Sequence, residues 1–93
     1  MSAEVDPAAR PRLARGVRLR ADAARGGYVL LAPERVLTTN PTAVAVLQRC
    51  DGARTVSAIV DDLAGVFSAD RARVMADVAA LLTSLAAKRM VEW

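Results

Sequence analysis

The chain has 93 residues, 54% of them hydrophobic, and its 13 basic and 10 acidic residues give a net charge of +3. This length predicts a single domain with a modest core. The chain has no histidine, which is the commonest general base and metal ligand, and its one cysteine cannot form an internal disulfide. It has no apolar run of 18 residues and no apolar N-terminal segment, so neither a membrane span nor a secretory signal is predicted. A reducing cytoplasm is therefore the expected location.

Basic charge is concentrated near the N-terminus. Six arginines and one acidic residue lie between Arg10 and Arg25, so this stretch carries +5 and the rest of the chain −2. Two interpretations stay open: the stretch attracts an acidic partner, or its arginines form an ordinary solvated face.

The first residues predict a tail in front of the folded domain. Residues 1–11 are small, charged and proline-bearing, without hydrophobic periodicity. This composition is typical of a disordered tail or a linker. The folded domain is therefore expected over residues 12–93.

Three strands are expected at the start of that domain. Apolar and charged residues alternate from Val17 to Asp22, as in a half-buried strand. Arg25-Gly26-Gly27 predicts a turn, and the apolar run over residues 28–32 predicts a second strand. A turn at Pro33-Glu34 then leads to a third strand over residues 35–39.

Two short amphipathic helices follow, joined by an Asp-Gly turn. Asn40 is a good cap for the first helix, and Pro41 fits its first turn. Gly52 stands where a left-handed residue is wanted at the end of that helix, and Thr55 can cap the second. Helical spacing places these residues on the two apolar faces: Ala43, Val46, Leu47 and Cys50 in the first helix, and Val56, Ile59, Val60, Leu63 and Phe67 in the second.

A third, longer helix is expected from Ala69 to Lys88, capped by Ser68. Its apolar residues span an arc of roughly 160°, wider than the stripe of about 100° that a surface helix needs. They are Val74, Met75, Val78, Ala79, Leu81, Leu82, Leu85 and Ala86. Either the N-terminal hairpin covers the extra apolar surface of this helix, or that surface forms one wall of an apolar groove beside an exposed strand.

Residues 90–93 are expected to form a short β segment or an irregular tail. The sum of these elements is an α+β, winged-helix-like fold, with a three-stranded antiparallel sheet followed by a three-helix bundle.

No residue pattern for catalysis is present. The adjacent carboxylates of Asp61 and Asp62 point about 100° apart on a helix, so they do not easily share one site, and a solvated face is predicted for them. The pair Gly26-Gly27 lacks the spacing of a phosphate-binding loop, and Cys50 has no histidine to activate it. We therefore predict a binding protein rather than an enzyme, with no metal and no cofactor.

An ordered string of residues resembles the signature of the pyrroloquinoline quinone (PQQ) biosynthesis protein D family. Its first part is Asn40-Pro-Thr-Ala43, Leu47, Cys50-Asp-Gly52, Arg54-Thr-Val56, Ile59 and Leu63, and its second part is Val74, Asp77-Val78, Leu81-Leu82, Leu85 and Met90-Val91. The resemblance covers about residues 12–92, and its most specific part is the Asp-Gly-x-Arg-Thr-Val turn.

The resemblance implies a peptide chaperone of the group called RiPP recognition elements. Such a domain binds a ribosomally made precursor peptide and presents it to a radical S-adenosylmethionine (SAM) enzyme, which crosslinks a glutamate and a tyrosine within the peptide. Family members occur alone or fused to another enzyme of the pathway. A monomer able to dimerise through its edge strand is the expected state, with no nucleic acid or membrane as partner.

In related recognition elements the peptide adds as a strand to the third strand and lies against the third helix. Transferred to this sequence, the resemblance implies an edge strand at Arg35, Val36, Leu37 and Thr38. Val74, Met75, Val78 and Leu82 would form one wall of the groove, and Arg71 would lie at its mouth, where it could pair with a carboxylate of the peptide. An edge strand suits this role because its unpaired backbone groups can template an incoming peptide.

The alternative is a winged-helix DNA-binding protein that would read DNA with the helix at residues 69–88. Its outward face carries Asp70 and Asp77 with several alanines, which are poor phosphate partners. The arginines lie instead in the N-terminal stretch. Peptide binding is therefore the preferred prediction.

Overall fold

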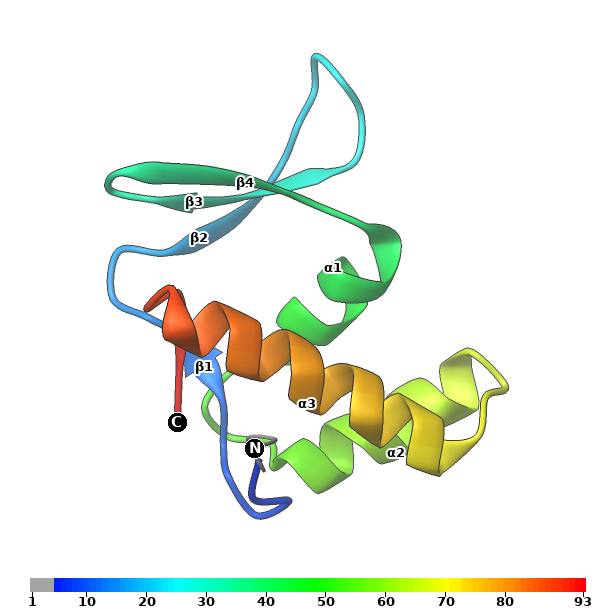
Figure 1. Cartoon of the computed structure of the whole chain (residues 1–93). Helices are drawn as coiled ribbons and strands as arrows, with labels where there is room; N and C mark the ends of the chain where they lie inside the picture. Colours follow the sequence, from blue (N-terminus) through cyan, green and yellow to red (C-terminus); the bar gives the residue numbers. More distant parts are fainter. Residues whose placement is uncertain (1–4) are drawn as a thin grey trace.

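The structure is a computed structural model, and it describes residues 5–93. The elements in chain order are β1 (Arg12–Leu13), β2 (Arg18–Ala21), β3 (Tyr28–Ala32), β4 (Arg35–Thr39), α1 (Pro41–Leu47), α2 (Val56–Val66), α3 (Arg71–Ala87) and β5 (Val91–Glu92). Figure 1 shows the sheet of β2, β3 and β4 on one side of the helices, with β4 leading directly into α1. This arrangement confirms the predicted α+β, winged-helix-like class.

The sheet has the order β2-β3-β4, with both pairs antiparallel. Leu19, Leu30 and Leu37 lie side by side across its three strands and face the helices, and Leu30 is completely buried. The predicted glycine turn joins β2 to β3, and both Gly26 and Gly27 have positive φ. Because β4 lies at the end of the strand order, it is an edge of the sheet.

The first two helices begin as the sequence predicts. The side chain of Asn40 accepts a hydrogen bond from the amide of Ala43 at 2.8 Å, and Pro41 occupies the first turn of α1. Thr55 Oγ1 accepts from the amide of Ala58 at 3.1 Å at the start of α2. Each cap satisfies a backbone donor that has no partner inside its helix.

The start of α3 differs from the prediction. Helix α3 begins at Arg71 after Asp70, so Ser68 does not cap it. Ser68 instead ends α2: its φ is 50°, its amide donates to the carbonyl of Gly65, and the next amide, that of Ala69, donates to Ala64. These two bonds form a Schellman motif. A serine shortly before a helix is therefore a misleading signal when another helix has just ended.

Residues 5–11 also differ from the expected disordered tail or linker, while residues 1–4 lie outside the described part of the chain. Val5 is 5% exposed and belongs to the core. The carbonyls of Pro7 and Ala9 accept hydrogen bonds from the first amides of α2, Ser57 and Val56, at 2.9 and 2.8 Å. The segment is ordered because it supplies acceptors that the start of a helix needs.

The end of the chain resolves the alternative that the sequence left open. Residues Val91–Glu92 form β5, which pairs antiparallel with β1, a short strand that the sequence analysis did not predict. Met90, just before β5, is 1% exposed. The pairing thus holds the C-terminus against the N-terminal segment.

The core lies between the inner face of the sheet and the three helices. Its residues with at most 2% exposure are Leu30, Val46, Val56, Ile59, Val60, Leu63, Val78, Leu82, Met90 and Val91. No described helix is long and apolar enough to cross a membrane.

Candidate functional site

A groove of about 210 Å³ runs between β4 and α3. Strand β4 contributes Leu37, Thr38 and Thr39 to its lining, α3 contributes Leu81, Ser84 and Leu85, and Lys88 follows directly after α3. Leu30, Asn40, Ala43 and Leu47 complete the lining. The groove therefore adjoins the open edge of the sheet, with an aliphatic floor and a rim of hydroxyl groups and one cation.

Strand β4 presents two different faces along this edge. Leu37 is half-buried and packs on the core, whereas Val36 lies on the outer face and is 65% exposed. In an antiparallel pair, alternate residues direct their N–H and C=O groups away from the partner strand. The five residues of β4 therefore offer two or three residues with outward backbone groups beside the groove.

The structure brings only some of the predicted site residues to the groove. Leu37 and Thr38 line it, while Arg35 and Val36 lie on the same strand but outside its lining. Leu82 is fully buried and belongs to the core, and Met75 is half-buried and packs on the core cluster.

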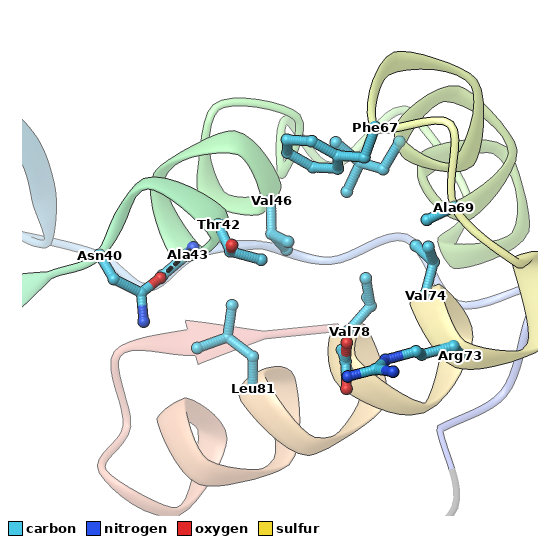
Figure 2. A pocket seen from close by; sticks show the side chains of 12 residues that line it. Asn40, Thr42, Ala43, Val46, Phe67, Ala69, Arg73, Val74, Val78 and Leu81 are labelled. Atoms are coloured by element: carbon cyan, nitrogen blue, oxygen red, sulfur yellow. Dashed lines mark hydrogen bonds between the residues drawn. The ribbon is translucent and has the colours of Figure 1, made fainter.

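A second pocket of about 320 Å³ adjoins the groove and contains the two remaining apolar residues of the predicted wall, Val74 and Val78. It lies between α1, the end of α2 and the N-terminal half of α3, and Figure 2 shows the side chains that line it. Leu81, Asn40 and Ala43 line both the groove and this pocket. The two hollows are therefore neighbours that share part of their walls.

Arg71, predicted at the mouth of the groove, does not line either hollow. Its guanidinium binds Asp61 and also donates to Ser57 Oγ at 2.9 Å, both on α2. Arg73, two residues further on, lines the second pocket instead. Asp61 is thus part of an ion pair and not simply a solvated carboxylate.

Leu81 lines both hollows but is not among the site residues predicted from the sequence. The apolar arc of α3 had already placed it at one shoulder of the helix, about 120° from Met75 at the other side. The arc alone does not indicate which shoulder faces the sheet. Ser84 and Lys88 lie near Leu81 on the same side of α3 and carry no apolar signal.

Two carboxylates are held ionised by their neighbours. Amides of Arg54 and Ala53 donate to Asp51 Oδ1, both at 2.9 Å, and lower the pKa of Asp51. Arg49 Nε donates to Asp62 Oδ2 at 2.5 Å and lowers the pKa of that carboxyl. Gly52 follows Asp51 in the turn between α1 and α2 and has a φ of 77°. The Asp-Gly-x-Arg-Thr-Val sequence therefore has a structural role, because its carboxylate and glycine build the turn between α1 and α2.

Cys50 is buried beside this turn. Its thiol donates to the carbonyl of Val46 at 3.3 Å, and burial, with a smaller contribution from the nearby Asp51 carboxylate, raises its pKa to about 11. A thiol of such a high pKa is a poor nucleophile at neutral pH. Among residues 5–93, no group of three His, Cys, Asp or Glu side chains is arranged to hold a metal ion.

Comparison with known proteins relates the sequence and the fold of this chain to one family. The family model of coenzyme PQQ synthesis protein D (PqqD) matches residues 27–91. A protein of Rhodopseudomonas palustris strain BisB5 called PqqA binding protein is 54% identical over 84 residues, which cover 90% of this chain and 82% of that protein. The bifunctional coenzyme PQQ synthesis protein C/D of Methylorubrum extorquens is 50% identical over 82 residues, which cover 88% of this chain but 22% of that protein.

A solved structure agrees in fold as well as in sequence. The solution NMR structure of the PqqD part of Methylobacterium extorquens PqqCD, described as a functional, stand-alone RiPP recognition element, has a TM-score of 0.78 and 49% identity. The similarity covers 89% of this chain and 88% of that one. With the family model over most of the chain and this agreement in structure, the chain belongs to the PqqD family of coenzyme PQQ synthesis proteins.

Proposed function

We propose that this protein binds the PqqA precursor peptide as an additional strand on β4, with peptide side chains in the groove against α3. The observation that carries the proposal is the open edge of β4 beside a groove whose opposite wall is α3. Main-chain hydrogen bonds to an edge strand give affinity, and pockets for alternate side chains give specificity. The name of the Rhodopseudomonas relative supports the same partner.

The bound peptide would then be presented to a radical SAM enzyme, which crosslinks a glutamate and a tyrosine within it. In this role the protein is a chaperone that acts through binding alone. Its groove fits that role because the lining consists of aliphatic and hydroxyl side chains, with Lys88 as its single charged residue.

The first experiment is an NMR titration of the labelled protein with synthetic PqqA precursor. Amides of residues 35–39, and of Leu81, Ser84 and Lys88, should shift. Duplex DNA is added to a second sample. Shifts from DNA at the arginines of residues 10–25, with none from the peptide, would favour the DNA-binding alternative and contradict the proposal.

A pair of matched variants tests the groove directly. Ser84→Trp places an indole in the groove and should weaken peptide binding by about tenfold or more, since it blocks contact with β4. Ala76→Trp, on the exposed face of the same helix, is the control and should bind as the unmodified protein does. Equal affinities of the two variants would place the peptide elsewhere.

A further inference from the structure

The second pocket, shown in Figure 2, has an apolar interior and a partly polar mouth. Val46, Leu63 and Val78 are nearly fully buried and form its interior. Phe67 lines it from the end of α2 and is 47% exposed, so a large apolar surface faces the hollow. A hollow of this kind gains free energy when an apolar group fills it.

The pocket begins where the backbone ladder of β4 ends. Beyond Thr39, the side chain and carbonyl of Asn40 bind the amides of Ala43 and Val44, and Pro41 has no N–H group to offer. A peptide strand on β4 that continues past Thr39 therefore leaves the strand ladder at that point. Beyond it, the side chains of the peptide meet the pocket.

The charges at the mouth indicate what kind of side chain fits. Arg73 and Asp77, one cation and one anion, stand on consecutive turns of α3 at the pocket. Within residues 5–93 neither has an oppositely charged group within 4.0 Å. The rim has no net charge, and a charged guest side chain would lose its hydration in the apolar interior without a buried partner. An uncharged, apolar guest is therefore favoured.

We propose that this pocket is an anchor subsite for one large apolar side chain of the bound peptide, of the leucine, methionine or phenylalanine class. The anchored residue lies just outside the stretch that pairs with β4. This inference rests on the proposed function, because the shared wall residues Asn40, Ala43 and Leu81 place the pocket beside the groove. It adds a specificity determinant that strand addition alone does not supply.

The test combines pocket variants with peptide variants. Thr42→Trp fills the pocket mouth from an exposed position on α1, and Ala72→Trp, exposed on α3 outside the pocket lining, is its control. Synthetic PqqA precursors, each with one large apolar residue replaced by serine, are titrated into the unmodified protein and both variants. Amide spectra of each variant establish that it is folded.

For the unmodified protein, one serine replacement outside the strand-pairing stretch should weaken binding about tenfold, as expected for losing one buried apolar side chain. Thr42→Trp should bind the unaltered precursor about tenfold more weakly and should be insensitive to that same replacement. Ala72→Trp should behave as the unmodified protein does.

Two results would overturn the inference, and they differ in what they leave standing. If Thr42→Trp binds every peptide as Ala72→Trp does while Ser84→Trp loses binding, the anchor subsite is wrong and strand addition survives. If the unmodified protein does not bind the precursor at all, the proposed function fails and the subsite fails with it.

Discussion

Two helices of this protein end at a non-glycine residue in the left-handed conformation. Ser68 follows α2 with a φ of 50°, and Arg89 follows α3 with a φ of 59°. After α3 the amides of Arg89 and Met90 donate to Ala86 and Leu85, which repeats the Schellman pattern seen after α2. An L-residue pays a steric cost in this conformation that glycine avoids.

Ser68→Gly should therefore stabilise the domain. The expected gain is about 0.5–1 kcal/mol, the relief of left-handed strain less the extra chain entropy of glycine. Urea unfolding monitored by circular dichroism measures it. Ser68→Ala keeps the β-carbon and should give no gain, so equal effects of the two substitutions would contradict this explanation.

The buried thiol of Cys50 makes stability depend on pH in the alkaline range. Its pKa is 9.0 in an unperturbed state and about 11 in the fold. Between these values the unfolded chain loses the thiol proton before the folded chain does, so stability falls as the pH rises. The loss is about 2–3 kcal/mol over this window.

Urea unfolding at pH 7, 9, 10 and 11, in a reducing buffer, tests this dependence. Cys50→Ala removes the titrating group, and its stability should decline less steeply above pH 9. Parallel curves for the two proteins would show that the thiol does not cause the alkaline loss.

At the scale of elements, the N-terminal segment is part of the fold and not an appendage. Its buried Val5 packs on the core, and its carbonyls bind the first amides of α2. Arg10 adds a hydrogen bond from Nη1 to the carbonyl of Ala53 at 2.5 Å. The segment therefore stabilises the start of α2 from outside the helix.

Val5→Ala should cost about 2 kcal/mol of unfolding free energy, because it removes two buried methyl groups. Val36→Ala deletes the same atoms from a side chain that is 65% exposed and should change stability by less than about 0.5 kcal/mol. Denaturant unfolding of both variants gives the comparison. A Val5 variant as stable as the Val36 variant would mean that the segment contributes little.

The two shoulders of α3 offer a second test at this scale. Leu81 lines both hollows, whereas Met75, on the other shoulder, lines neither, and both side chains are half-buried. Leu81→Glu should weaken precursor binding by about tenfold or more, because it puts a charge into the apolar lining. Met75→Glu should keep the affinity within about twofold. Isothermal titration calorimetry measures both, and the reverse order would favour the wall that the sequence analysis proposed.

At the scale of the whole molecule, the six N-terminal arginines do not form a single stripe. Arg12 pairs with Glu92 at 3.5 Å and Arg10 bonds Ala53, whereas Arg18 and Arg20 lie on β2, at the opposite edge of the sheet from β4. Charge that is concentrated in the sequence is thus dispersed in the fold.

Precursor binding should consequently depend weakly on salt. Between 50 and 200 mM salt the dissociation constant should rise by less than about tenfold, whereas a protein that contacts 6–10 DNA phosphates loses about 10³–10⁵ in affinity over this range. Fluorescence anisotropy of a labelled precursor at several salt concentrations measures the slope. A steep slope would indicate that the arginines dominate binding.

Local signals explain why much of the fold was predictable. Asn40, Pro41 and Thr55 act on neighbours within a few residues, so their roles follow from the chain itself. Gly52 does not end α1 as predicted, because α1 ends at Leu47 and the amide of Gly52 donates to the distant carbonyl of Pro11. Hydrophobic periodicity likewise located three strands and three helices. The prediction that Ser68 caps α3 is wrong because serine suits both the start of one helix and the end of another.

The order of residues by itself determined the three strands of the sheet, the three helices that follow them and the wide apolar arc of α3. Only the tertiary structure decided that residues 5–11 cap α2, that β1 pairs with β5, and that the shoulder of α3 with Leu81 faces β4. The reason is physical: caps and periodicity depend on nearby residues, whereas strand pairing and the rotation of a helix against a sheet depend on contacts between residues far apart in the chain.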